Sequence, residues 1–189
     1  MTPAQEPNNW YALHTRSNFE NRVAEALNEK GVESFLPAFE EVHQWKDRKR
    51  RISIPLFPGY VFARLANSPA QRLLVLKTAG VVKILGNGDR IEAIPEHEIA
   101  AVYALVNAKV RCFSHPFLRD GVRVRVRRGP LKDVEGYLLR IKNQTRLVIS
   151  VTLISQSVAI EVDAPDVELL RTAPFEAAGY RSKQQCIQI

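Results

Sequence analysis

The 189-residue sequence predicts two domains of different class, an α+β N-terminal domain with a small, mainly antiparallel sheet flanked by helices, and a small all-β barrel. Up to about residue 106, segments with strand and helix periodicity follow one another in the order β-α-β-β-α-β-α. Between 122 and 170, five short runs rich in Val, Ile and Leu are separated by turn residues. We therefore expect domains at 8–106 and 119–171, a linker at 107–118 and a disordered tail at 172–189.

The first domain opens with a strand and a helix. Residues 9–15 alternate in the manner of a strand with one buried face. Ser17 and Glu20 have the spacing of a capping box, and Lys30-Gly31 has the composition of a helix end. The next extended segment, 32–39, is interrupted at Pro37, and 52–55 is a further short strand.

The central stretch of this domain runs from Pro55 to Leu65, with a Pro58-Gly59 turn before a strand at 61–65. It carries three aromatic residues, Phe57, Tyr60 and Phe62, which suit either a hydrophobic core or a docking surface. Ser68-Pro69 then begins a helix that Gly80 ends, residues 81–85 form a strand, and Pro95 begins a third helix.

The second domain begins with a strict alternation of valine and arginine from Val122 to Arg127. This period of two predicts a strand with valines inside and arginines in water. Because β-branched residues are poor helix formers and the alternation leaves no apolar stripe on a helix, we expect strands here in the free protein. We also expect this domain not to mask a binding site on the first.

Composition excludes several function classes. No run is long enough for a membrane span, the start of the chain has no apolar signal core, and two cysteines do not make a disulfide framework, so we expect a cytoplasmic protein. The histidines lack metal-ligand spacing and no nucleotide or nucleophile motif occurs, so we expect neither an enzyme nor a cofactor. The net charge of +7 favours a polyanionic partner.

Several motifs together resemble the NusG family of transcription factors. They are Trp10-Tyr11-Ala12-Leu13, Phe19-Glu20-x-x-Val23-Ala24, Phe57-Pro58-Gly59-Tyr60-Val61 and Asp120-Gly121-x-x-Val124-x-Val126, followed by Gly129-Pro130 and Gly136. The resemblance implies a NusG N-terminal domain and an SH3-like KOW barrel. The amino-acid sequence around the Phe57 motif is more similar to the specialised paralogues of the RfaH, UpxY and LoaP groups than to the housekeeping factor of the family.

The resemblance also implies a partner, RNA polymerase, bound at the clamp helices of its β′ subunit by a monomer that promotes elongation and antitermination. The implied contact residues form an apolar depression and are Leu13, His14, Phe57, Tyr60, Phe62 and Ile84. The helix start at Asn67-Ser68-Pro69 lies where family members reach the β subunit across the cleft.

Six basic residues and one aromatic are the implied contacts with upstream or non-template DNA: Arg16, Trp45, Lys46, Arg48, Lys49, Arg50 and Arg51. Trp45 is the aromatic among them and would stack on an unpaired base. The alternative is a merely solvated basic loop.

In the barrel, Arg123, Arg125 and Arg127 are a candidate surface for nascent RNA, and Ile154 takes the place of an aromatic that binds Rho or the ribosome in the family. The alternative function is a KOW-type RNA- or ribosome-binding module without polymerase affinity.

Overall fold

The computed structural model describes residues 7–44, 49–87, 90–108, 112–115, 122–141, 144–163 and 166–170. The elements up to the third helix are β1 (Asn8–Thr15), α1 (Glu20–Glu29), β2 (Glu33–Phe35), β3 (Ala38–Gln44), β4 (Lys49–Pro55), β5 (Tyr60–Ala66), α2 (Pro69–Leu76), β6 (Val81–Ile84), β7 (Gly86–Asn87), β8 (Arg90–Ile91), β9 (Ala93–Ile94) and α3 (Glu96–Asn107). Those that follow are β10 (Cys112–His115), β11 (Val122–Val126), β12 (Glu135–Ile141), β13 (Gln144–Val151), β14 (Gln156–Glu161) and β15 (Val167–Leu169).

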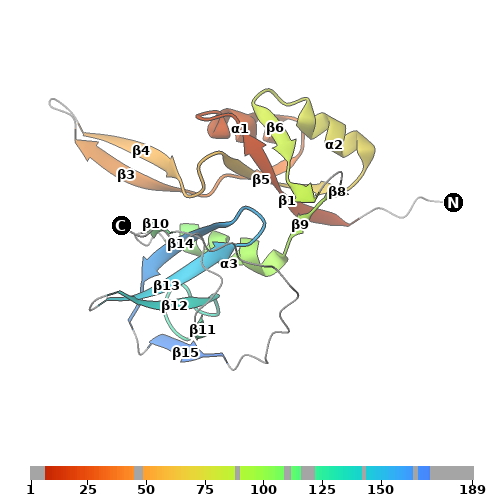
Figure 1. The fold of residues 1–189 in the computed structure, drawn as a ribbon. Helices are drawn as coiled ribbons and strands as arrows, with labels where there is room; N and C mark the ends of the chain where they lie inside the picture. The colour runs from red at the N-terminus through yellow and green to blue at the C-terminus, as the bar shows by residue number, and fades with distance from the viewer. Residues whose placement is uncertain are drawn as a thin grey trace, which may run out of the picture.

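The first sheet has the strand order β2-β5-β1-β6, and β9 also pairs with β1. Side chains alternate along β1, so neighbouring residues enter two different cores. Tyr11 and Leu13 pack in one core with Val23 and Leu27 of α1. Trp10 lies in the other, which α3 closes. The sheet is thus covered by α1 and α2 on one face and by α3 on the other (Figure 1).

Helix α1 begins later than the sequence predicted. Its N-cap is Phe19, which makes no side-chain cap hydrogen bond, and Asn18 has a left-handed φ of 63°. The capping box of Ser17 and Glu20 was therefore wrong, because the Glu20 carboxylate accepts a hydrogen bond from the turn before β5 instead. The predicted end is confirmed, since Gly31 has a φ of 75° and its N–H donates to Asn28 O.

The strands β3 and β4 pair only with each other and form a hairpin that projects from the first sheet (Figure 1). Their register runs from Ala38 opposite Pro55 to Gln44 opposite Lys49. The basic segment predicted as a loop is therefore partly a strand, because backbone pairing continues as far as Lys49. Pro37 separates this hairpin from β2, as expected for a residue that has no N–H to donate to a ladder.

The second sheet is antiparallel, with the order β10-β14-β13-β12-β11-β15. Its last five strands in the sequence, β11 to β15, match the five predicted ones, and none of 122–126 or 147–160 is helical. The predicted linker, however, contains β10, where Cys112 pairs with Ile160 and His115 with Ser157. A segment without apolar periodicity has thus become an edge strand, because ladder hydrogen bonds use the backbone alone.

The two domains are in contact, whereas the sequence suggested domains that are joined only by a linker. Helix α3 lies between the two sheets (Figure 1), and one apolar cluster runs from Trp10 through α3 to Ile149 of β13. Tyr103 points to the first sheet and stacks on Phe35 at 3.7 Å between ring centroids. Helix α3 also carries the small residues Ala100 and Ala104, which line a groove against the second sheet. Within the described ranges no helix has the length and apolar character needed to cross a bilayer.

Candidate functional site

A half-buried pair of rings lies at one end of the first sheet, on the face that α3 covers elsewhere. His14 of β1 is directly opposite Tyr60 of β5, and their ring centroids are 5.5 Å apart. Lys83 of β6 is opposite His14 on the other side. Both rings are half-buried. Residues directly opposite each other on antiparallel strands point to the same face of the sheet, so the three side chains form a row across β5, β1 and β6. Two of the three are amphipathic rings, and the sheet holds them in place.

The turn that precedes Tyr60 fixes one end of this row. Pro58 and Gly59 occupy its central positions, Gly59 has a φ of 81°, and the Tyr60 N–H donates to Phe57 O at 3.1 Å. Proline followed by a residue with positive φ is the arrangement of a type II turn, which favours glycine at the second position. The sequence signal at Pro58-Gly59 is therefore confirmed, and Tyr60 starts β5 at a defined point.

The six predicted polymerase contacts do not form one apolar depression. Leu13, Phe57 and Phe62 are almost completely buried, with 0–1% of their surface exposed. Ile84 is opposite Leu13 and packs in the core under α1 and α2, on the other face of the sheet from His14 and Tyr60. This corrects the sequence analysis, which grouped neighbouring residues of β1 although adjacent strand residues point to opposite faces.

The predicted nucleic-acid residues are concentrated in the β3–β4 hairpin. Trp45, Lys46 and Arg48 lie outside the described residues. Lys49, Arg50 and Arg51 lie on β4, paired in register with Gln44, His43 and Val42. Arg16 follows β1, is exposed, and its N–H donates to Gly80 O at 2.8 Å.

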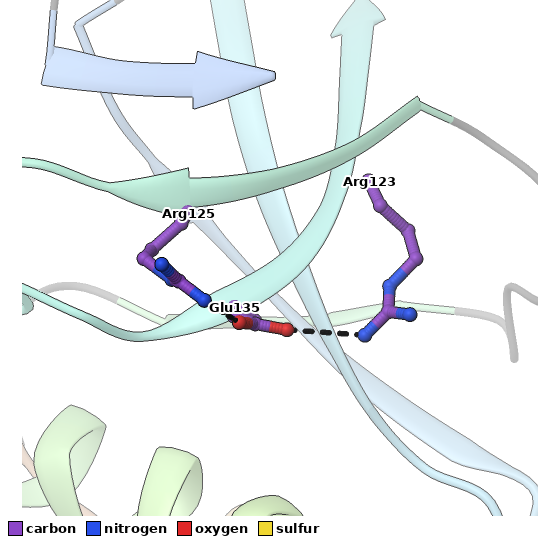
Figure 2. Close-up of polar contacts among 3 residues, drawn as sticks. All are labelled: Arg123, Arg125 and Glu135. Carbon is purple, nitrogen blue, oxygen red and sulfur yellow. Dashed lines mark hydrogen bonds and ion pairs between the residues drawn. The ribbon is translucent and has the colours of Figure 1, made fainter. Parts of the chain in front are cut away.

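The arginines of β11 are neutralised by carboxylates on the neighbouring strands. Glu135 of β12 lies between two of them, accepting hydrogen bonds from Arg125 at 2.6 Å and 3.1 Å and from Arg123 at 3.1 Å (Figure 2). Hydrogen bonding to Glu135 raises the pKa of Arg125 above its ordinary value. Arg127 is 3.7 Å from Glu168 of β15. The predicted burial of the valines is confirmed for Val124 and Val126 and is wrong for Val122, which is 53% exposed. The arginines form cross-strand ion pairs rather than free cations.

The turn between β13 and β14 lies against the first domain. Ile154, the predicted partner contact, is only 6% exposed and belongs to the continuous apolar cluster. The neighbouring Thr152 donates its backbone N–H and its hydroxyl to the two carboxylate oxygens of Glu98 on α3, at 3.0 Å and 2.7 Å. Close by, α3 and strands β11 to β13 enclose a groove of 560 Å³. In this arrangement of the domains, Ile154 is therefore not available to a partner.

Sequence reasoning missed two glutamates that position these surfaces. Glu20 is a buried carboxylate whose Oε1 accepts the Gly59 N–H at 2.8 Å, and Glu98 joins the domains. Glu20 is part of the family motif, yet a local capping rule explained it without a long-range partner. Glu98 sits in the first turn of a helix, where an acidic residue is favourable in any case. Neither pattern therefore indicated a partner distant in sequence.

Comparison with known proteins agrees with this architecture. The family model described as "Transcription termination factor nusG" matches residues 8–103. The Transcription termination/antitermination protein NusG of Staphylococcus aureus is 28% identical in an alignment 176 positions long, which covers 85% of this chain and 95% of that protein. A solved structure described as "Domain interaction in Thermotoga maritima NusG" is similar in fold, with a TM-score of 0.52, 19% identity, and coverage of 87% of this chain and 98% of the other. Since the family model matches more than half of the chain, the chain belongs to the NusG family.

Proposed function

We propose that this protein is a transcription elongation and antitermination factor that binds RNA polymerase through the His14–Tyr60 pair. Two half-buried rings, opposite each other on the central strands of the first sheet, are the observation that carries the proposal. Aromatic side chains on a rigid element give a large contact area with little loss of conformational entropy. Membership of the NusG family supports polymerase as the partner.

The proposed target on the polymerase is the tip of the β′ clamp helices, a helical hairpin. A helix tip fits a shallow surface that combines apolar and hydrogen-bonding groups, and His14, Tyr60 and the adjacent Lys83 supply both. The N-terminus of α2 at Ser68 and Pro69 is the proposed contact with the β subunit across the cleft. Ser68 caps this helix, accepting the Gln71 N–H at 3.3 Å, so the segment has a fixed conformation.

The β3–β4 hairpin is proposed to contact upstream or non-template DNA. It projects from the first sheet (Figure 1), and Lys49, Arg50 and Arg51 follow one another on β4. Cationic side chains on a projecting hairpin reach phosphates without displacing the domain from the polymerase, and such contacts weaken with salt. This contact would orient the factor and not select a sequence by itself.

The alternative is an RNA- or ribosome-binding module that does not bind polymerase. Its main support in the sequence was the arginine stripe of β11, and those arginines are paired with Glu135 and Glu168. Paired guanidiniums are weaker phosphate ligands than free ones, because binding must first break an existing ion pair. The stripe therefore favours a structural role, and a Rho or ribosome contact through Ile154 requires that the domains separate.

The test is a binding measurement between the full-length protein and core RNA polymerase, with and without the β′ clamp-helix tip. We expect binding that depends on the tip and that falls at least tenfold in Tyr60→Ala, since truncating a central aromatic anchor costs about 2 kcal/mol or more. Leu169→Ala is the matched control, because it truncates an apolar side chain that is 71% exposed on the second domain. Normal binding by folded Tyr60→Ala would refute the docking site, and binding to ribosomes alone would favour the alternative.

A further inference from the structure

The turn that carries Tyr60 is held from both sides by residues outside it. Gly59 donates its N–H to Oε1 of Glu20 at 2.8 Å, and its carbonyl accepts the Thr15 N–H at 2.8 Å. Both backbone groups of Gly59 are thereby satisfied, one by the start of α1 and the other by the end of β1. The turn is fixed relative to the same strand that carries His14.

Glu20 is unusual for an acidic residue because it is only 7% exposed. A buried carboxylate is unfavourable unless it is hydrogen-bonded. Here it lies in the first turn of α1, where the helix dipole favours a negative charge, and it accepts the Gly59 amide. A hydrogen bond to an ionised acceptor is stronger and more directional than a neutral one. The Gly59 N–H of the turn is therefore held by a side chain that is 39 residues away in the sequence.

We propose that Glu20 is a positioning residue for the polymerase-docking pair, an inference that rests on the proposed function. Glu20 acts through Gly59, whose φ of 81° brings the chain into β5 with Tyr60 opposite His14. Without an acceptor, the Gly59 N–H has no partner and the turn gains alternative conformations. Tyr60, as the next residue, is displaced from His14, and the two rings no longer present one surface.

The experiment compares three substitutions of Glu20 in the full-length protein. Glu20→Ala removes the acceptor, Glu20→Gln keeps a carbonyl oxygen at the same reach, and Glu20→Asp keeps the charge but withdraws it by one methylene. Glu25→Ala, at an exposed position of the same helix, is the control. The readouts are affinity for core polymerase, the melting temperature, and the amide NMR shifts of Gly59 and Tyr60.

We expect Glu20→Ala to lower polymerase affinity about tenfold and to move both amide signals, with Glu20→Asp intermediate. Glu20→Gln should remain within about threefold of the unmodified protein, because a neutral acceptor still fixes the turn. Should Glu20→Ala not fold, Glu20→Asp decides by the same readouts.

The inference fails if the folded variants have a lower melting temperature while binding polymerase normally, since Glu20 would then have only a structural role. It fails equally if Glu20→Gln binds as weakly as Glu20→Ala. Normal binding by Tyr60→Ala would instead refute the docking site itself, so the two failures can be distinguished.

Discussion

Glu98 on α3 binds Thr152 of the β13–β14 turn with both carboxylate oxygens, one accepting the backbone N–H and the other the hydroxyl. The two residues are 54 positions apart and belong to different domains. They are the two ends of a polar contact beside the continuous apolar cluster. This contact holds the turn that contains Ile154 against the first domain.

The first prediction concerns this contact. Glu98→Ala should weaken the association of the domains by about 1 kcal/mol, less than is usual for hydrogen bonds to a charged group, because this contact is exposed to solvent. Small-angle scattering and the rotational correlation times of the two domains measure the separation. Glu96→Ala, in the same first turn of α3, is the control. Domains that tumble together equally in both variants would show that the apolar cluster alone holds them.

The second prediction separates core from surface in the aromatic stretch. Phe57→Ala should destabilise the first domain by about 3–5 kcal/mol, because Phe57 is 1% exposed and packs edge-on against Phe62 with centroids 5.9 Å apart. Tyr60→Ala should cost much less, since Tyr60 is only half-buried. Denaturant unfolding followed by tryptophan fluorescence measures both. Equal decreases in stability in the two variants would place Tyr60 in the core and remove it from the proposed surface.

The third prediction compares two glycines that share positive φ and differ in their surroundings. A Cβ at Gly80 would lie 2.8 Å from Cδ1 of Phe19 and 2.9 Å from Cγ2 of Val23, whereas a Cβ at Gly31 meets nothing within 4 Å. Gly31→Ala should therefore cost only about 1 kcal/mol of backbone strain. Gly80→Ala should cost about 3 kcal/mol, because overpacking adds to that strain. Thermal unfolding of both variants tests the difference, which a similar decrease in stability in each would contradict.

The fourth prediction concerns the hairpin. Replacing Lys49, Arg50 and Arg51 by glutamine should weaken binding to an elongation complex and reduce the log–log salt slope by about 0.7–0.9 for each phosphate that is no longer neutralised. Binding to core polymerase without nucleic acid should not change. Titrations at several salt concentrations, with and without the nucleic-acid scaffold, make the comparison. An unaltered slope would indicate a basic segment that is merely solvated.

The fifth prediction uses the carboxylates of the second sheet. Glu135→Gln frees two guanidiniums, Arg123 and Arg125, so the non-specific RNA affinity of the protein should rise and its log–log salt slope should steepen by about 1–2. Glu168→Gln frees only Arg127 and should have about half that effect. Fluorescence anisotropy with single-stranded RNA measures both. If the unmodified protein already binds RNA as strongly as Glu135→Gln, the ion pairs do not suppress binding.

The sequence predicted the fold well where local chemistry decides the outcome. The Ser68 cap, the left-handed Gly31 and the strand at residues 122–126 all appear as expected, because caps, turns and periodicity depend on near neighbours. The turn before the aromatic stretch also appears where its Pro-Gly pair predicts it. Each of these features is decided within a single domain.

The candidate site was less predictable, for physical reasons. Leu13 and His14 were placed on one surface, although a strand sends adjacent residues to opposite faces, and Phe57 is 1% exposed in the large apolar cluster rather than part of a docking surface. The contact between domains uses Ala101 and Ala104, whose small side chains look the same in sequence whether they face solvent or another sheet. A hydrogen bond such as that of Glu98 to Thr152 leaves no periodic signal at all.

The strand β10 has a consequence for the reach of the second domain. Because Cys112 already pairs with Ile160, only the stretch between Asn107 and Cys112 joins α3 to the second sheet, and fully extended it spans about 17 Å. So short a tether keeps the second domain at a millimolar effective concentration beside α3, about what short flexible linkers give. A ligand that competes for α3 must therefore displace the second domain, which stays tethered beside the helix. If β10 separates from β14, the next strand of the sheet begins at Val122, so the fully extended tether lengthens from about 17 Å to about 50 Å and the edge strand also sets the distance that the second domain can travel.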